Sequence, residues 1–237
     1  MEGEGLEKRK WSNSCHENKI EIDCIMFCFE QNSLKVLLVK NENASEDVSW
    51  KLPNTIVEEE ETMLKAAQRL LKKYVSEEDF FLEQLKAFGY HSPLSIREKI
   101  SIGYYAMVRK EKNEEEDDEK NSDKVWVDIN NIVGLDQKAM VILDFSLKEL
   151  RKNICCSAVG FNLLPEKFTL LQVVHLYEKI LGIEINKTNF RRKMLQRKLV
   201  HGINEKEEGV SNRAAEFYSL NVPKHEFFWN AKFNFNF

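Results

Sequence analysis

Long apolar runs are missing from this sequence. No stretch approaches the roughly 20 apolar residues that a membrane-spanning helix needs, and the opening residues, MEGEGLEKRKW, hold no apolar signal region. Prolines number only four, beside 43% apolar and 11% aromatic residues, which is a globular composition. We therefore expect a cytoplasmic protein without a membrane segment, long enough for one large domain or two modest ones.

Cysteine and histidine are present, but without the spacing of a metal site. Five cysteines, an odd number, fit a reducing compartment better than a disulfide framework. Cys24 and Cys28 lie an even number of residues apart in a strand-like run, so both face one side; we interpret them as buried thiols, with a metal site as the alternative. Cys155-Cys156 has no second pair to complete a zinc site. No metal and no cofactor are expected.

The first two thirds of the chain have a net negative charge, and the last third has a net positive charge. From Cys155 to the end there are 12 Lys and Arg against 8 Asp and Glu, whereas the preceding residues have 23 against 31. The acidic run EKNEEEDDEKNSD over residues 111–123 is typical of a solvated loop between strands. The uneven charge predicts a nucleic-acid-binding module in the last third, attached to an acidic domain.

Strand-like and helical patterns alternate between residues 20 and 153, after a polar arm over residues 1–19. Runs rich in β-branched and aromatic residues predict strands, and apolar periodicity predicts a helix after residue 61 and another over residues 137–153. The predicted strands cover residues 20–29, 34–39, 80–88, 100–108 and 124–129. A mixed α+β domain follows from this order.

The pattern changes over residues 154–222. Thr169 is a good N-cap for a first helix, Gly182 is placed to end it, and Asn186 can cap a second helix. The predicted helices cover residues 170–181 and 187–199, and two strands that pair as a wing cover residues 200–204 and 214–220. Helix, turn, helix and hairpin are the parts of a winged helix-turn-helix. The aromatic tail over residues 223–237 has no predicted role.

The second helix of this module is strongly basic. In a recognition helix, N-terminal side chains reach base edges in the major groove, whereas Arg and Lys bind phosphates. The predicted DNA-binding residues are Lys187, Thr188, Asn189, Arg191, Arg192, Arg197 and Lys198 on the helix and Arg213 beside the second wing strand. An ordinary solvated basic face is one alternative. A surface for a protein partner is another, and it predicts no DNA affinity at low salt.

The segment WKLPNTIVEEEETMLKAAQRLLKKY over residues 50–74 resembles a Nudix box that has lost most of its acidic residues. The spacing of Glu61 and Arg69 fits the family pattern. The box positions are Thr55 for the glycine, Glu61, Arg69, Leu70 for the next glutamate, and Lys73 and Tyr74 for the closing glutamate pair. Mg²⁺ wants several oxygen ligands, which Leu and Lys do not supply. The resemblance therefore implies a Nudix scaffold without catalytic residues.

The same segment has a simpler interpretation. Ala67, Leu70, Leu71 and Tyr74 recur at the spacing of a helix with one buried stripe. Residues 58–61 are all glutamate and are expected at the start of this helix, where acidic residues favour the positive end of its dipole. An ordinary amphipathic helix accounts for both features.

Motifs in the last third are similar to those of Nudix-related transcriptional regulators of the NrtR and AraR type. They are GFNLLPEKFTL over residues 160–170, LYE over residues 176–178, ILG over residues 180–182 and NFRRK over residues 189–193, within a similarity that runs from about residue 20 to residue 221. The resemblance implies an α+β fold, a Nudix-like α/β/α sandwich over residues 20–153 followed by a winged helix-turn-helix over residues 154–222. It also implies a homodimeric repressor that leaves its double-stranded operator on binding a sugar or an ADP-ribose-type nucleotide.

The motif after the Phe-Gly strand differs from that of many members of the family. Phe88-Gly89 is followed here by YHSP rather than an Arg-Asp-Pro-type motif. His91, Arg97 and Tyr104 are the candidate effector-binding residues from their position after that strand. The alternative function is a Nudix-type hydrolase of ADP-ribose or nucleotide sugars, and the choice depends on the site rather than on the fold.

Overall fold

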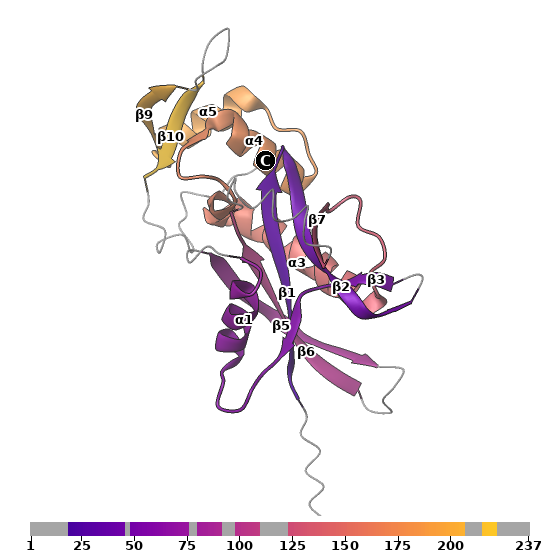
Figure 1. Ribbon diagram of the computed structural model, residues 1–237. Helices are drawn as coiled ribbons and strands as arrows, with labels where there is room; N and C mark the ends of the chain where they lie inside the picture. The colour runs from indigo at the N-terminus through magenta and orange to yellow at the C-terminus, as the bar shows by residue number, and fades with distance from the viewer. Residues whose placement is uncertain are drawn as a thin grey trace, which may run out of the picture.

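The computed structural model describes residues 19–45, 48–75, 80–91, 98–109, 123–206 and 215–221. Within these ranges one large mixed sheet and one small sheet are joined by helices (Figure 1). The strands are β1 (Glu21–Glu30), β2 (Ser33–Ser45), β3 (Val48–Lys51), β4 (Asn54–Ile56), β5 (Phe81–His91), β6 (Glu98–Met107), β7 (Lys124–Asp128), β8 (Phe168–Thr169), β9 (Val200–Lys206) and β10 (Glu216–Leu220). The helices are α1 (Met63–Lys72), α3 (Gln137–Cys156), the 3₁₀ helix η2 (Val159–Leu163), α4 (Leu170–Leu181) and α5 (Lys187–Gln196).

The large sheet is covered by helices on both faces. Its strand order is β3-β2-β1-β6-β5, with β4 paired to β1 and β7 to β2, and β1 runs parallel to β6. Alternate residues of β1 enter two separate cores: Cys24 and Cys28 pack under α1, whereas Ile25 and Phe27 pack with α3. Both cysteines are buried free thiols, as predicted, and burial raises the pKa of Cys24. The predicted sandwich is confirmed.

Helix α1 begins later than the sequence pattern suggested. Its N-cap is Thr62, whose side chain accepts a hydrogen bond from the Lys65 N–H. The first turn of the helix therefore contains no acidic residue, and residues 58–61 precede it. The prediction that these glutamates start the helix was wrong, because the threonine hydroxyl caps it after the acidic run has ended. The predicted buried stripe is confirmed for Ala67, Leu70 and Leu71.

Helix α4 begins and ends where the sequence predicted. Its N-terminus is a capping box: Thr169 Oγ1 accepts from the Gln172 N–H at 3.2 Å, and Gln172 Oε1 accepts from the Thr169 N–H at 2.7 Å. Its C-terminus is Gly182, in the left-handed region at φ 69°. These local signals define both ends of the helix.

Replacing Thr169 with Ala is expected to lower the free energy of unfolding by about 1 kcal/mol. The Gln172 N–H would lose its acceptor at the start of α4. Thr169→Ser keeps the hydroxyl and serves as the control, with stability close to that of the parent. Urea denaturation followed by circular dichroism measures both. Equal losses in the two variants would assign the effect to the lost methyl group rather than to the cap.

Helix α5 ends at Gln196, earlier than the predicted residue 199. The Leu199 N–H donates to the Met194 carbonyl, and the Lys198 N–H donates to the Leu195 carbonyl. This is a Schellman motif, and it places Lys198 in the left-handed region at φ 53°. The side chains of Met194 and Leu199, the two residues that this motif joins, are both buried. Glycine is the usual residue at such a helix end, so a lysine at this position gave no signal in the sequence that the helix ends here.

One connected hydrophobic core extends from the large sheet into the small one. It includes Phe27 of β1, Val159 of η2, Tyr177 of α4 and Phe190 of α5. The tip of the β1–β2 hairpin reaches α4 (Figure 1), where Asn32 Oδ1 lies 3.3 Å from His175 Nδ1. Arg151 of α3 donates from Nε to the Ile180 carbonyl at 2.8 Å. The two predicted domains thus share their packing, and α3 continues to Cys156 across the predicted boundary at residue 153.

No helix among the described ranges is both long and apolar enough to cross a membrane.

Candidate nucleic-acid interface and Nudix-like site

Helix α5 presents its basic side chains on the face that is turned away from the core. Phe190 and Met194 are buried, and the Phe190 ring lies 5.4 Å from the Tyr177 ring of α4. The predicted DNA-binding residues that are exposed are Lys187, Thr188, Asn189, Arg191, Arg192 and Lys198, and Arg197 is half-buried. The structure brings these seven residues together on α5 and at its end, which is the arrangement of a recognition helix. Arg213 lies outside the described residues.

Two of the arginines are oriented by neighbouring side chains. Arg192 donates from Nη2 to Asn189 Oδ1 at 2.9 Å, one turn back along α5. Arg191 Nη2 lies 3.5 Å from the Tyr218 hydroxyl of β10, and that hydroxyl donates to Glu216 at 2.7 Å. Because β10 belongs to the predicted wing, Arg191 links the helix to the wing. Both guanidinium groups are thus placed while remaining exposed.

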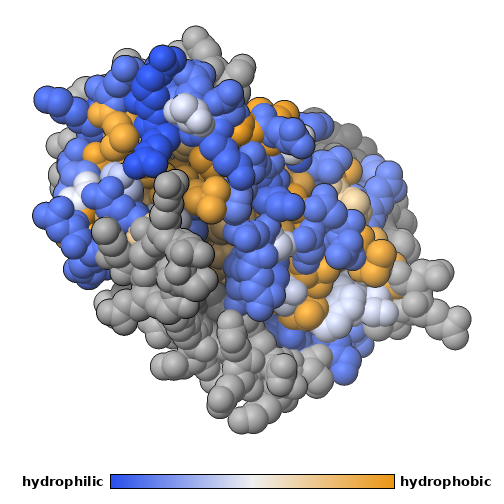
Figure 2. Space-filling model, turned by 90° about the horizontal axis from the view of Figure 1, so that it is seen from above, coloured by the Kyte–Doolittle hydropathy of each residue, from blue (hydrophilic) through white to orange (hydrophobic). Residues whose placement is uncertain are grey.

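The wing is built as the sequence predicted, by antiparallel pairing of β9 and β10. A third strand, β8, pairs with β10 and was not predicted, since two residues are too few for a pattern. Lys167, just before β8, bonds Glu205 of β9 at 2.7 Å. Seen from this end, the molecule has a mostly hydrophilic surface with smaller hydrophobic patches (Figure 2).

The Nudix-like box forms a polar network around Arg69. Its guanidinium donates to both carboxylate oxygens of Glu61, at 3.0 and 2.8 Å, and to the Thr55 hydroxyl at 3.1 Å. It also bonds the Ile56 carbonyl at 3.0 Å and lies 3.3 Å from Glu58. Hydrogen bonds from Arg69 hold the pKa of Glu61 below its usual range. The box carboxylate therefore ties the loop before α1 to the helix.

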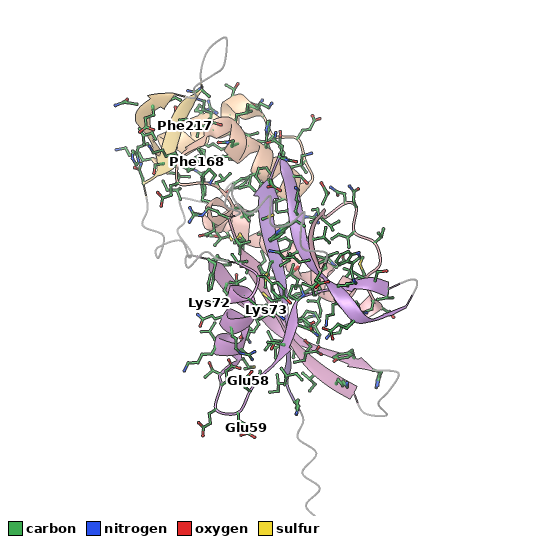
Figure 3. All side chains as sticks on the ribbon, viewed as in Figure 1. Glu58, Glu59, Lys72, Lys73, Phe168 and Phe217 are labelled. Carbon is green, nitrogen blue, oxygen red and sulfur yellow. The ribbon has the colours of Figure 1, made fainter. Side chains whose placement is uncertain are left out.

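The other box positions lie along α1 and beyond its end. Leu70 is buried in the core, and Lys73 and Tyr74 follow the last helical residue, with Lys73 Nζ 5.3 Å from the centre of the Tyr74 ring. Figure 3 shows Lys72 and Lys73 at one end of α1 and Glu58 and Glu59 beyond the other. Glu58 and Glu59 thus lie at the opposite end of α1 from Lys73.

The three candidate effector-binding residues are not gathered at one place. His91 lines a cavity of about 570 Å³ between the end of β5 and the start of α3, together with Tyr90 and Lys138. Tyr104 is buried on the other face of the sheet, under α1, where its hydroxyl bonds Gln84 at 2.8 Å. Arg97 lies outside the described residues. His91 alone of the three therefore lines this cavity among the residues that the structure describes.

A largely buried ion cluster beside this cavity was not predicted. Lys138 Nζ of α3 lies 2.9 Å from Glu21 and 2.7 Å from Asp23 of β1, and 4.3 Å from the centre of the Tyr90 ring. The Tyr90 hydroxyl donates to Glu21 at 2.5 Å, and Ser101 donates to Asp23. The sequence signal was the alternation of two acids with apolar residues in the run EIDCIMF, but the lysine partner is far along the chain.

Burial and pairing compete in this cluster. Burial alone would lower the pKa of Lys138, but Asp23 and Glu21 outweigh it and the pKa is raised. Burial raises the pKa of Asp23. For Glu21, burial is outweighed by the Tyr90 hydroxyl and Lys138, and the pKa is lowered. Burial and the bond to Glu21 raise the pKa of Tyr90 to about 12. The charged lysine therefore holds two carboxylates inside the fold.

Comparison with known proteins shows a similarity that covers the winged-helix segment and most of the chain. Residues 160–220 match the model of the NrtR DNA-binding winged helix domain. The ADPR responsive transcriptional repressor NtrR of Acinetobacter baylyi is 23% identical over 210 residues, which cover 87% of this chain and 83% of that protein. The similarity to NrtR-type regulators that the sequence motifs indicated is confirmed.

Solved structures show the same fold. Shewanella oneidensis NrtR complexed with a 27mer DNA is 24% identical, with a TM-score of 0.73, over 85% of this chain and 93% of that one. A MutT/nudix family protein from Enterococcus faecalis is 18% identical, with a TM-score of 0.61, over 93% of this chain and 89% of that one. The predicted α+β fold, a Nudix-like domain followed by a winged helix, is confirmed.

Proposed function

We propose that this chain is a ligand-responsive, DNA-binding transcriptional regulator that acts in the cytoplasm, with α5 as its recognition helix. The observation that carries the proposal is the exposed basic face of α5, fixed by the capped helix α4 and by the wing within a segment that matches the NrtR winged helix model. Arginines and lysines on such a face bind phosphates, and the side chains at the N-terminus of the helix read base edges. The direction of control is repression, as in the Acinetobacter relative.

The Nudix-like domain is the sensor in this proposal. The similar repressor is ADPR responsive, which favours an ADP-ribose-type nucleotide as effector, with a sugar as the other candidate. Two copies form a homodimer that reads a palindromic operator with half-sites one helical turn, or multiples of it, apart. Effector binding then changes the affinity for DNA by a coupling free energy of about 1–3 kcal/mol.

Selection of bound sequences from a randomised duplex library, at moderate salt, tests the proposal. Enrichment of a palindrome supports a dimeric, sequence-specific regulator and supplies the probe for effector titrations. Absence of enrichment, together with absence of duplex binding at low salt, overturns it and favours the protein-interaction module instead.

The alternative function, hydrolysis, needs a metal site that these residues do not fit. Mg²⁺ assists attack on a pyrophosphate only when several oxygen ligands hold it. Leu70, Lys73 and Tyr74 stand at the positions that the Nudix pattern reserves for glutamates, and Glu61 is bonded through both oxygens to Arg69. We infer that the chain is not a hydrolase.

Incubation of the full chain with ADP-ribose and Mg²⁺ or Mn²⁺ is therefore expected to give no AMP. The measurement is chromatography of the products after long incubation at high enzyme concentration. Glu61→Gln is the control for any trace of activity. Turnover that this substitution abolishes would contradict the proposal and make the chain a hydrolase, whereas turnover that it leaves unchanged would identify a contaminant.

A further inference from the structure

Lysines from two strands, Lys51 and Lys124, lie on one face of the large sheet, and Lys73 follows the end of α1. Val39 of β2 is the register partner of Lys51 on β3 and of Lys124 on β7. Directly paired residues point to the same face of a sheet. That face is the one under α1, because Leu37 and its partner Trp126, two residues away, pack in the core that α1 covers.

These lysines line a cavity of about 440 Å³ at the end of α1. The volume is in the range of about 300–1,000 Å³ that is usual for small-molecule sites. Its charged lining residues are Lys40, Lys51, Lys73, Lys124, Glu42 and Asp123. Four lysines against two carboxylates leave an excess of two positive charges, which is the charge of one Mg²⁺ ion. Lys73 stands at a position where the Nudix pattern has a metal-binding glutamate.

Two of these lysines lack a direct acidic partner within the described part of the chain. Neither Lys51 nor Lys73 forms an ion pair there, whereas Lys40 lies 3.9 Å from Asp123. A metal ion in this cavity would be repelled by the ammonium groups, and an anion would be attracted. The positive charge of the cavity therefore favours the binding of phosphate oxygens and disfavours the binding of a metal ion.

We propose that this cavity binds the diphosphate group of a small-molecule ligand directly, with lysines in place of the metal ion. The inference rests on the proposed sensor function and names the chemistry of its effector. Each ammonium group offers three donors and binds phosphate as a point charge. Lys51 and Lys124 are two strand spacings apart, about 9.5 Å at the backbone. Their side chains can thus bracket two linked phosphates, and Lys73 lines the same cavity.

The test is calorimetric titration of the full chain with inorganic pyrophosphate in the presence of EDTA. Binding without metal is expected, and it should weaken as salt is raised. Removal of Lys51 and of Lys73, singly and together as K51A/K73A, should weaken binding by about tenfold for each lysine. Lys72→Ala is the matched control, since Lys72 is the exposed neighbour of Lys73 and does not line the cavity.

Titrations with other phosphate compounds distinguish a diphosphate site from a general anion site. Orthophosphate should bind more weakly than pyrophosphate, and ADP-ribose should lose affinity in the same variants. Lys73→Glu, which restores the acid of the Nudix pattern, should abolish metal-free binding without touching the core, and thermal melting of each variant checks its fold.

Three outcomes would overturn the proposal: no pyrophosphate binding in EDTA, binding that appears only with added Mg²⁺, or an equal loss in Lys72→Ala. Duplex binding by the parent chain, measured on the same preparation without ligand, is a separate readout. Its absence would count against the regulator function alone, and the pyrophosphate titration would still decide the anion site.

Discussion

At 0.1 M salt, the R191A/R192A variant is expected to bind its operator about 60-fold more weakly than the parent chain. Each phosphate contact contributes about 0.9 to the slope of log affinity against log salt, so the loss of two contacts should flatten that slope by about 1.8. Both arginines are exposed on α5 and held in place by Asn189 and Tyr218. Fluorescence anisotropy with a labelled duplex, over a series of salt concentrations, gives both quantities.

The control for this experiment is K65A/K72A, which removes the same charge from the exposed surface of α1. Its affinity and its salt slope should match those of the parent. An unchanged slope in R191A/R192A would remove the two arginines from the interface. An equal change in both variants would mean that overall charge, rather than α5, determines binding.

Replacement of Lys138 with Met is expected to lower the free energy of unfolding by about 3–5 kcal/mol. The substitution leaves the carboxylates of Glu21 and Asp23 inside the fold without their cation. Lys148→Met, an exposed position on the same helix, is the control, with an expected change within about 0.5 kcal/mol. Urea denaturation at pH 7 measures both. Equal stability of the two variants would show that the cluster is not needed for folding.

The pH dependence of stability follows from the same cluster. A lysine with a raised pKa stabilises the fold fully below its unfolded pKa, and this contribution is lost as the pH rises through the raised value. Lys138 has such a pKa, and Tyr90, with a pKa of about 12, acts in the same direction. The parent should therefore lose stability from about pH 10 upward. The loss should be shallower in Lys138→Met, because only Tyr90 then contributes.

Local signals explain which elements the sequence predicted well. Both ends of α4 were located because each signal is local: Thr169 caps the helix with its hydroxyl, and Gly182 adopts the left-handed backbone conformation that ends it. The end of α5 was misplaced because Lys198 occupies a backbone conformation that normally indicates glycine. Strand β4 was not predicted, since its three residues carry too short a pattern; pairing with β1 makes it a strand.

The candidate sites also differ in whether local sequence signals define them. The basic face of α5 was predictable because helical periodicity alone separates it from Phe190 and Met194. The ion cluster around Lys138 and the lysines around Val39 were not, because their members meet only through the register of distant strands and the packing of α3. Periodicity can be recognised in the sequence, but the register between distant strands cannot.

The connected core has a consequence for how a signal would travel. The segment between α3 and α4 is itself packed, with Ser157, Ala158 and Val159 buried, and α4 rests against β2 and α3. The proposed recognition helix α5 is thus packed against the proposed sensor domain rather than joined to it by a free linker. We expect a displacement of the β1–β2 hairpin to turn α4, and α5 to turn with it as one unit. Splitting the chain at residue 153 would divide this shared core and expose an apolar surface on both halves.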